Sequence, residues 1–169
     1  MYRWGSTATA GTRDLWYSGP DLDSTPVVIV GTPAGEYTPS PSPDGGWFAY
    51  ASDESGQFEV YVRPFPGPGG QSLVSVNGGL NPKWAPSGTE IFYLGLDGVF
   101  NVATVRTDPD FAVESRERLN PHPGFWQEFI RHWDLAPDGQ RLLVVRDVVS
   151  RQIVVVVNWF EELRQRMGN

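Results

Sequence analysis

The chain has 169 residues, of which 40% are hydrophobic and 13% aromatic, so it can bury the core of one folded domain. Its formal net charge of −7 disfavours nucleic acid and anionic membrane surfaces as partners. The absence of cysteine excludes disulfides and thiolate metal sites, and no apolar run approaches the roughly 18 residues of a membrane-spanning helix.

Glycine and proline are abundant, at 19 and 15 residues, which is typical of short strands joined by tight turns. The first two predicted strands, at 14–17 and 27–30, precede a pattern that occurs three times further along the chain. Each occurrence is a turn made of proline, then Asp or Ser, then glycine, and its prolines are Pro43, Pro86 and Pro137. Proline fixes φ, the polar side chain can bond backbone N–H groups, and glycine accepts positive φ.

A strand is predicted on either side of each turn, and a third and fourth follow. The second strands are nearly continuous apolar runs, as expected of strands covered on both faces. The first strands are predicted at 38–41, 82–85 and 133–136, and the second at 47–50, 90–94 and 141–145. The third strands are predicted at 59–62, 99–102 and 153–157, and the fourth at 72–76 and around 111–114.

The three turns lie 43 and 51 residues apart, close to the roughly 40–50 residues of a four-stranded propeller blade. We therefore predict an all-β fold, a partial β-propeller of about three and a half four-stranded antiparallel blades in a single domain. The expected parts are an incomplete blade at 1–35, blades at 36–79 and 80–120, and a last blade with an insertion at 121–158. A short C-terminal helix is expected at 159–167, with Asn158 and Glu161 as a capping box.

The repeated segments PSPSPDG from Pro39, PKWAPSG from Pro82 and, more weakly, WDLAPDG from Trp133 resemble TolB-like, or PD40 (WD40-like), β-propeller repeats. The segments SDESGQFEVYVRPFPGPGG, LNPKWAPSGTEIFYL and VVVVNWFEEL are similar to the C-terminal propeller of bacterial serine/threonine protein kinases. The resemblance implies a propeller that senses or scaffolds, in a parent that would place it in the periplasm if membrane-anchored. The chain as it stands is expected to be soluble and cytoplasmic. Kinase activity is not implied, because the sequence has no kinase Gly-rich loop, His-Arg-Asp or Asp-Phe-Gly motif.

Such an arc of blades would leave a bare sheet face at each end, and a soluble monomer rarely exposes so large an apolar patch. One hypothesis is that two arcs form a homodimer and close a ring of seven or eight blades. The alternative is that the missing blades lie upstream on a parent polypeptide.

The residues just before each first strand would ring the mouth of the channel and bind a protein or peptide. We expect no cofactor and no metal, since the turn carboxylates lack the spacing of a calcium loop and are better explained as hydrogen-bonded turn residues. Arginine and aromatic residues add the character common in interface hot spots. The candidate binding residues are Glu36, Tyr37, Arg63, Asn81, Phe125, Trp126, Arg131 and His132.

The alternative function is a small serine-type hydrolase, resembling an esterase, that uses His132. Asp134 could orient the histidine ring, and Ser87 or Ser150 could supply the nucleophile. No Gly-x-Ser-x-Gly elbow supports this alternative. We therefore expect a non-catalytic binding module.

Overall fold

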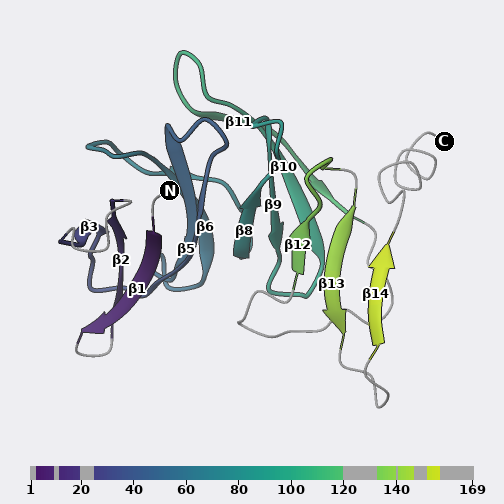
Figure 1. The fold of residues 1–169 in the computed structure, drawn as a ribbon, viewed down its shortest axis with the longest axis horizontal. Coiled ribbons are helices and arrows are strands. Elements are labelled where there is room, and N and C mark those ends of the chain that lie inside the picture. Colours follow the sequence, from purple (N-terminus) through teal and green to yellow (C-terminus); the bar gives the residue numbers. More distant parts are fainter. Residues whose placement is uncertain are drawn as a thin grey trace.

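The computed structural model describes residues 3–9, 12–19, 25–119, 133–139, 141–146 and 152–156. Within these ranges all regular elements are β-strands, and they form four antiparallel sheets that follow one another along the chain (Figure 1). No helix in the described ranges is long and apolar enough to cross a membrane. The prediction of an all-β partial propeller is confirmed, whereas the expected helix at 159–167 lies outside the described residues.

The two middle sheets each have four strands in chain order, as in a propeller blade. The second sheet contains β4 (Glu36–Pro41), β5 (Trp47–Ser52), β6 (Glu59–Pro64) and β7 (Ser72–Leu73). The third contains β8 (Leu80–Trp84), β9 (Glu90–Leu94), β10 (Phe100–Arg106) and β11 (Ala112–Arg118). The last of these strands extends four residues beyond the segment around 111–114 that its sequence indicated.

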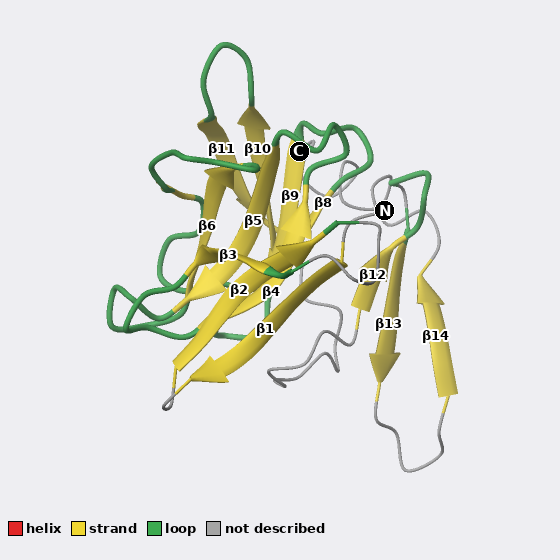
Figure 2. Ribbon diagram, turned by 60° about the vertical axis from the view of Figure 1, so that its left-hand side comes forward, coloured by secondary structure: helices red, strands yellow, loops and turns green. Residues whose placement is uncertain are grey.

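The two end sheets each have three strands among the described residues. The first sheet contains β1 (Arg3–Thr9), β2 (Thr12–Ser18) and β3 (Val27–Val30), and the sequence pattern did not predict β1. The fourth contains β12 (Trp133–Leu135), β13 (Leu142–Arg146) and β14 (Gln152–Val156). Figure 2 shows the strands running side by side, with the connecting loops at their ends.

The repeated Pro-Asp/Ser-Gly segments form the tight turns that the sequence predicted. In each turn the glycine has positive φ and its N–H donates to the carbonyl oxygen three residues earlier. These bonds join Gly45 to Ser42 at 3.0 Å, Gly88 to Ala85 at 3.0 Å and Gly139 to Ala136 at 2.8 Å. The Asp44 carboxylate accepts from the Gly46 N–H at 3.0 Å, as expected of a hydrogen-bonded turn residue.

Three apolar clusters fill the junctions between successive sheets, and single strands contribute to two of them. In β9, Phe92 packs toward the fourth sheet while Ile91 and Tyr93 pack toward the second. In β5, Tyr50 packs toward the first sheet and Ala49 packs toward the third. Successive residues of a strand point to opposite faces, so a blade covered on both sides needs continuous apolar strands.

The first strands of the three later sheets lie beside one another, as expected around a propeller axis. The Ser40 hydroxyl of β4 accepts from the Trp84 N–H of β8 at 3.2 Å. Lys83 of β8 in turn forms an ion pair with Asp134 of β12 at 2.9 Å. Trp84 packs in the apolar cluster between the second and third sheets.

A β-bulge interrupts β4 and β8 at the same point of the repeat. Thr38, before Pro39, has φ 49°, and Asn81, before Pro82, has φ 52°. The register with the second strand shifts at both places. Because the strands continue beyond the bulge, Glu36 and Tyr37 belong to β4 and Asn81 to β8, whereas the sequence analysis placed them just before these strands.

Candidate functional site

The end of the sheets at which β4 and β8 begin is called the rim here. It also holds the β5–β6 turn, the β9–β10 turn and the β7–β8 connection. The strand pairing places these segments at the same end of the sheet. Glu36 at the start of β4 lies opposite Ser52 at the end of β5, and Ser52 lies opposite Glu59 at the start of β6. The Pro-Asp/Ser-Gly turns lie at the other end.

Glu36 is a carboxylic acid built into the wall of the rim. Its side chain is fully buried, Oε1 accepts from the Thr32 hydroxyl, and Oε2 has no partner among the described residues. Burial raises the pKa of this carboxyl, and the nearby carboxylates of Asp14 and Glu54 raise it further, while the bond from Thr32 lowers it. An unpartnered buried oxygen is costly, so Glu36 is not explained by stability alone.

Tyr37 and Asn81 are also at the rim, in different settings. The Tyr37 ring packs edge-on against Phe58, with centroids 5.3 Å apart, and the Arg13 guanidinium lies 4.9 Å from its centroid. Asn81 is only 1% exposed, and neither polar atom of its side chain has a partner among the described residues. The bulge that holds Asn81 thus brings an amide into the wall of the rim without satisfying it.

Arg63 is the predicted binding residue that the structure separates from the rim. It lies opposite Phe48, which pairs with Pro41 at the far end of the same sheet. The described structure therefore brings Glu36, Tyr37 and Asn81 to one end and leaves Arg63 at the other. The remaining candidates, Phe125, Trp126, Arg131 and His132, lie outside the described residues.

Two of the four residues suggested for a hydrolase are described, and each binds another residue. Asp134 accepts the ion pair from Lys83, and its Oδ1 also accepts from the Leu135 N–H at 2.8 Å. The Ser87 hydroxyl lies in the β8–β9 turn, where it accepts from the Thr89 N–H at 3.3 Å and the Thr89 hydroxyl at 3.0 Å. His132 and Ser150 lie outside the described residues.

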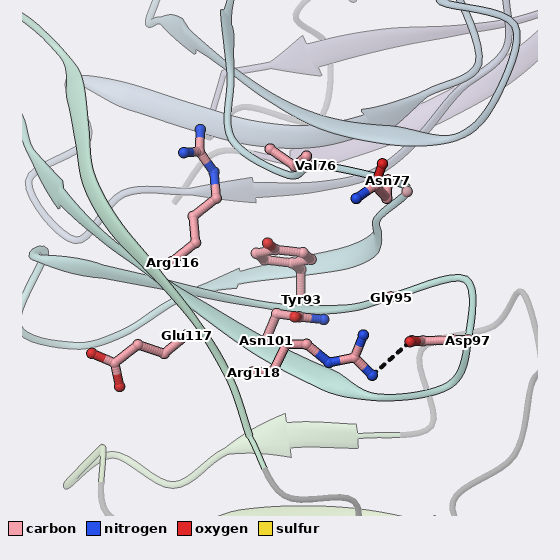
Figure 3. A pocket seen from close by; sticks show the side chains of 10 residues that line it. Val76, Asn77, Tyr93, Gly95, Asp97, Asn101, Arg116, Glu117 and Arg118 are labelled. Carbon is pink, nitrogen blue, oxygen red and sulfur yellow. Dashed lines mark ion pairs between the residues drawn. The ribbon is translucent and has the colours of Figure 1, made fainter. Parts of the chain in front are cut away.

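A pocket of about 220 Å³ opens at the rim between the second and third sheets (Figure 3). The β7–β8 connection forms one wall, and β9, β10, β11 and the β9–β10 turn form the other. No pattern in the sequence predicted this pocket. Its lining residues are Val76, Asn77, Gly78, Tyr93, Gly95, Asp97, Asn101, Arg116, Glu117 and Arg118.

Buried hydrogen bonds hold the β7–β8 connection in place over the pocket. The Glu59 carboxylate accepts from the Ser75 hydroxyl, from the Gly78 N–H at 2.9 Å and from the Gln57 amide at 2.6 Å. Across the junction, Arg116 Nε donates to the Val74 carbonyl at 2.6 Å. The wall of the pocket is therefore a rigid, pre-formed surface.

Polar side chains also line the pocket. Tyr93 is only 3% exposed and lies on the wall formed by β9. Burial raises the pKa of Tyr93 despite the opposing effect of the Arg116 charge, so the hydroxyl stays protonated and can donate. Asn77, at φ 64°, presents its amide from the other wall.

The signals that could have revealed this pocket in the sequence are weak. Tyr93 is one residue of an apolar strand, so the sequence pattern indicates only that it is buried. Arg116 lies in β11, beyond the segment predicted as that strand. The pocket exists only because β8 brings residues 76–78 against a strand about 40 positions later, and this depends on blade packing.

No protein-family profile matches this sequence, and no curated protein matches it. Solved structures do match by fold. A protein assigned as TolB from Agrobacterium tumefaciens superposes with a TM-score of 0.65 at 20% identity, covering 91% of this chain and 56% of that one.

Two enzymes give weaker matches. A protein assigned as a 6-phosphogluconolactonase from Bacteroides uniformis has a TM-score of 0.53 at 14% identity, covering 91% of this chain and 51% of that one. A puromycin-hydrolyzing peptidase from Mycobacterium tuberculosis has a TM-score of 0.51 at 15% identity, covering 90% of this chain and 36% of that one. This chain thus spans between 36% and 56% of the length of these structures. At such identities the likeness shows the fold alone, which is a partial β-propeller.

Proposed function

We propose that this chain is a non-catalytic binding module that engages a protein or peptide at the rim. The observation that carries the proposal is the rim pocket, which has pre-formed walls and polar side chains on its lining. Its volume of about 220 Å³ is below the roughly 300–1,000 Å³ of most small-molecule sites, so it suits one or two side chains of a larger ligand.

Apolar side chains beside the pocket fit the same kind of ligand. Val76 is 55% exposed and Leu96 is 37% exposed, and both belong to the loops that frame the pocket. Peptide and protein ligands combine apolar anchors with a few oriented hydrogen bonds. The alternative of a hydrolase built around His132 has less support, because Asp134 forms its ion pair with Lys83.

The module is proposed to work as part of a closed ring formed by two copies of the chain. The end sheets have three strands each among the described residues, one fewer than the middle sheets. Their exposed apolar side chains include Val28 at 58% and Leu143 at 47%. Because the chain covers 56% of the TolB-like structure, a second copy would supply about the missing part of a ring.

Selection of short random peptides against the immobilised protein tests the binding function. The enriched peptides are then titrated, by fluorescence anisotropy, with wild type and with two variants of similar exposure. Val76→Glu places a charge beside the pocket and should weaken binding at least tenfold. Leu73→Glu is the control, since Leu73 lies opposite Tyr61, whose ring packs toward the first sheet. Failure to enrich any peptide, or equal binding by the Val76→Glu variant, would contradict the proposal.

A further inference from the structure

The β7–β8 connection contains a bend that requires an asparagine followed by a glycine. Asn77 has φ 64° and Gly78 has φ 104°, so two successive residues adopt positive φ. Asparagine tolerates this region better than most residues, and glycine adopts it freely. A Cβ atom on Gly78 would also lie 2.5 Å from Leu96 Cδ1, closer than side-chain carbons approach. The backbone and its packing therefore impose the Asn-Gly pair.

This pair is also the dipeptide in which asparagine is chemically least stable. The backbone nitrogen of the next residue can attack the side-chain amide, and a glycine has no side chain that hinders the attack. Asn77 is the only asparagine of the chain that is followed by glycine. Its side chain is exposed on one wall of the rim pocket (Figure 3), so water has access to it.

A buried carboxylate holds the nitrogen that would attack. The Gly78 N–H donates to Glu59 Oε1 at 2.9 Å, and the Glu59 side chain is only 5% exposed. The Ser75 hydroxyl and the Gln57 amide donate to the same carboxylate and fix its position. The attack requires the nitrogen to move and to lose its proton. A hydrogen bond to a charged acceptor opposes both changes.

We infer that Asn77 is a deamidation site whose rate is set by the release of Gly78 from Glu59. Once released, the Gly78 nitrogen gives its proton to hydroxide and bonds to Asn77 Cγ. The Cγ–Nδ2 bond breaks, and Nδ2 takes a proton from solvent and leaves as ammonia. Water then opens the succinimide ring at one of its two carbonyls, which leaves aspartate or isoaspartate at position 77. This inference goes beyond the proposed function and does not depend on it.

Timed incubation in mildly alkaline buffer, followed by peptide mass spectrometry, tests the inference. The conversion of Asn77 is measured in the folded protein and in a synthetic peptide of residues 73–81. Hydrogen exchange at the Gly78 amide reports how rarely the bond to Glu59 opens. Because both reactions need the same local opening, the folded chain should deamidate more slowly than the peptide by the protection factor of that amide. Equal rates in protein and peptide, or no conversion in the protein after the time that this factor gives, would overturn the inference.

A substitution at Glu59 tests what sets the rate. Glu59→Ala should accelerate conversion of the folded chain at least about tenfold, the factor expected for loss of one hydrogen bond to a charged group. Glu117→Ala removes an exposed carboxylate of the same pocket and should leave the rate unchanged. Circular dichroism shows whether each variant is folded. An unchanged rate in a folded Glu59→Ala variant would contradict the role of Glu59. If that variant does not fold, the wild-type comparison decides, since it needs no substitution.

Two other asparagines serve as controls within the same sample. Asn81 precedes Pro82, whose nitrogen carries no proton, and Asn101 precedes the branched Val102 inside β10. Both should remain asparagine while position 77 converts. Conversion of Asn101 as fast as that of Asn77 would show that the Asn-Gly bend does not determine the site, and the inference would fail.

Discussion

Glu36 shows how one residue can be placed at a cost to the fold. Its side chain is fully buried in β4, and only one of its two oxygens has a partner among the described residues. Burial and the charges of Asp14 and Glu54 raise its pKa above the ordinary 4.5. At neutral pH the folded protein must therefore keep a carboxylate ionised where ionisation is unfavourable, or bind a proton that the unfolded chain releases.

We predict that Glu36→Gln stabilises the protein at pH 7. The folded-state pKa is raised, so the folded protein binds more protons than the unfolded chain and wild type loses stability as pH rises above about 4.5. Glutamine keeps an acceptor for Thr32 and does not titrate. Urea unfolding from pH 7 to pH 4 should show an advantage for the variant that is largest at pH 7 and shrinks as pH falls. Glu117→Gln, at an exposed position, is the control, and a pH-independent difference would contradict the assigned cause.

The turns were predictable from sequence because their chemistry is local. Proline, a polar residue and glycine act within four positions, so Asp44 and Gly45 adopt the conformations expected of them. The apolar runs of β5 and β9 correctly indicated strands covered on both faces. The bulges at Thr38 and Asn81 were not predicted, because a β-branched Thr at positive φ contradicts local preference and persists only through the surrounding sheet.

The site was predictable only in part, since its location depends on strand direction and blade packing. Glu36, Tyr37 and Asn81 were expected just before the first strands and lie within β4 and β8, at one end of the sheets. Arg63 was grouped with them although it lies four residues after Glu59, the residue of β6 that lies opposite Ser52, and so at the other end of the sheet. The pocket around Tyr93 joins segments of different blades, and no local pattern encodes such a junction.

We predict that Glu59→Ala destabilises the β7–β8 connection more than any exposed substitution. The Glu59 side chain is 5% exposed and accepts from Ser75, Gly78 and Gln57, so its removal leaves the buried Ser75 and Gly78 donors without this acceptor. The expected loss is about 2–4 kcal/mol in the free energy of unfolding. Hydrogen exchange should also accelerate at the amides of Val60 and Gly78. Glu117→Ala, which removes an exposed carboxylate, should change neither measurement, and protected amides in the Glu59 variant would contradict this role.

The four described sheets form an arc, and each end sheet has one face that no other described sheet covers. Each junction between neighbouring sheets buries an apolar cluster, so every interior blade is covered on both faces. The outermost sheets have such a junction on one side only among the described residues. In a closed propeller this asymmetry disappears, because each blade lies between two others.

If a second copy closes the ring, the mass in solution should be that of a dimer, and one substitution in the contact should lower it. Val28 is 58% exposed on β3 and lies opposite Trp16, so it belongs to the outer face of the first sheet. If two copies close the ring, light scattering should give a mass near twice 18.8 kDa that falls on dilution. Val28→Glu would place a charge in the apolar contact and shift the chain toward 18.8 kDa, because burying an unpaired charge is strongly unfavourable.

Leu73→Glu is the control for that measurement, since Leu73 is 46% exposed on β7 of an interior blade and should leave the mass unchanged. Circular dichroism would show that each variant remains folded. A folded wild-type chain that stays at 18.8 kDa at every concentration would contradict closure by a second copy. The peptide-binding function would survive that result, because all the described residues that line the rim pocket come from one chain.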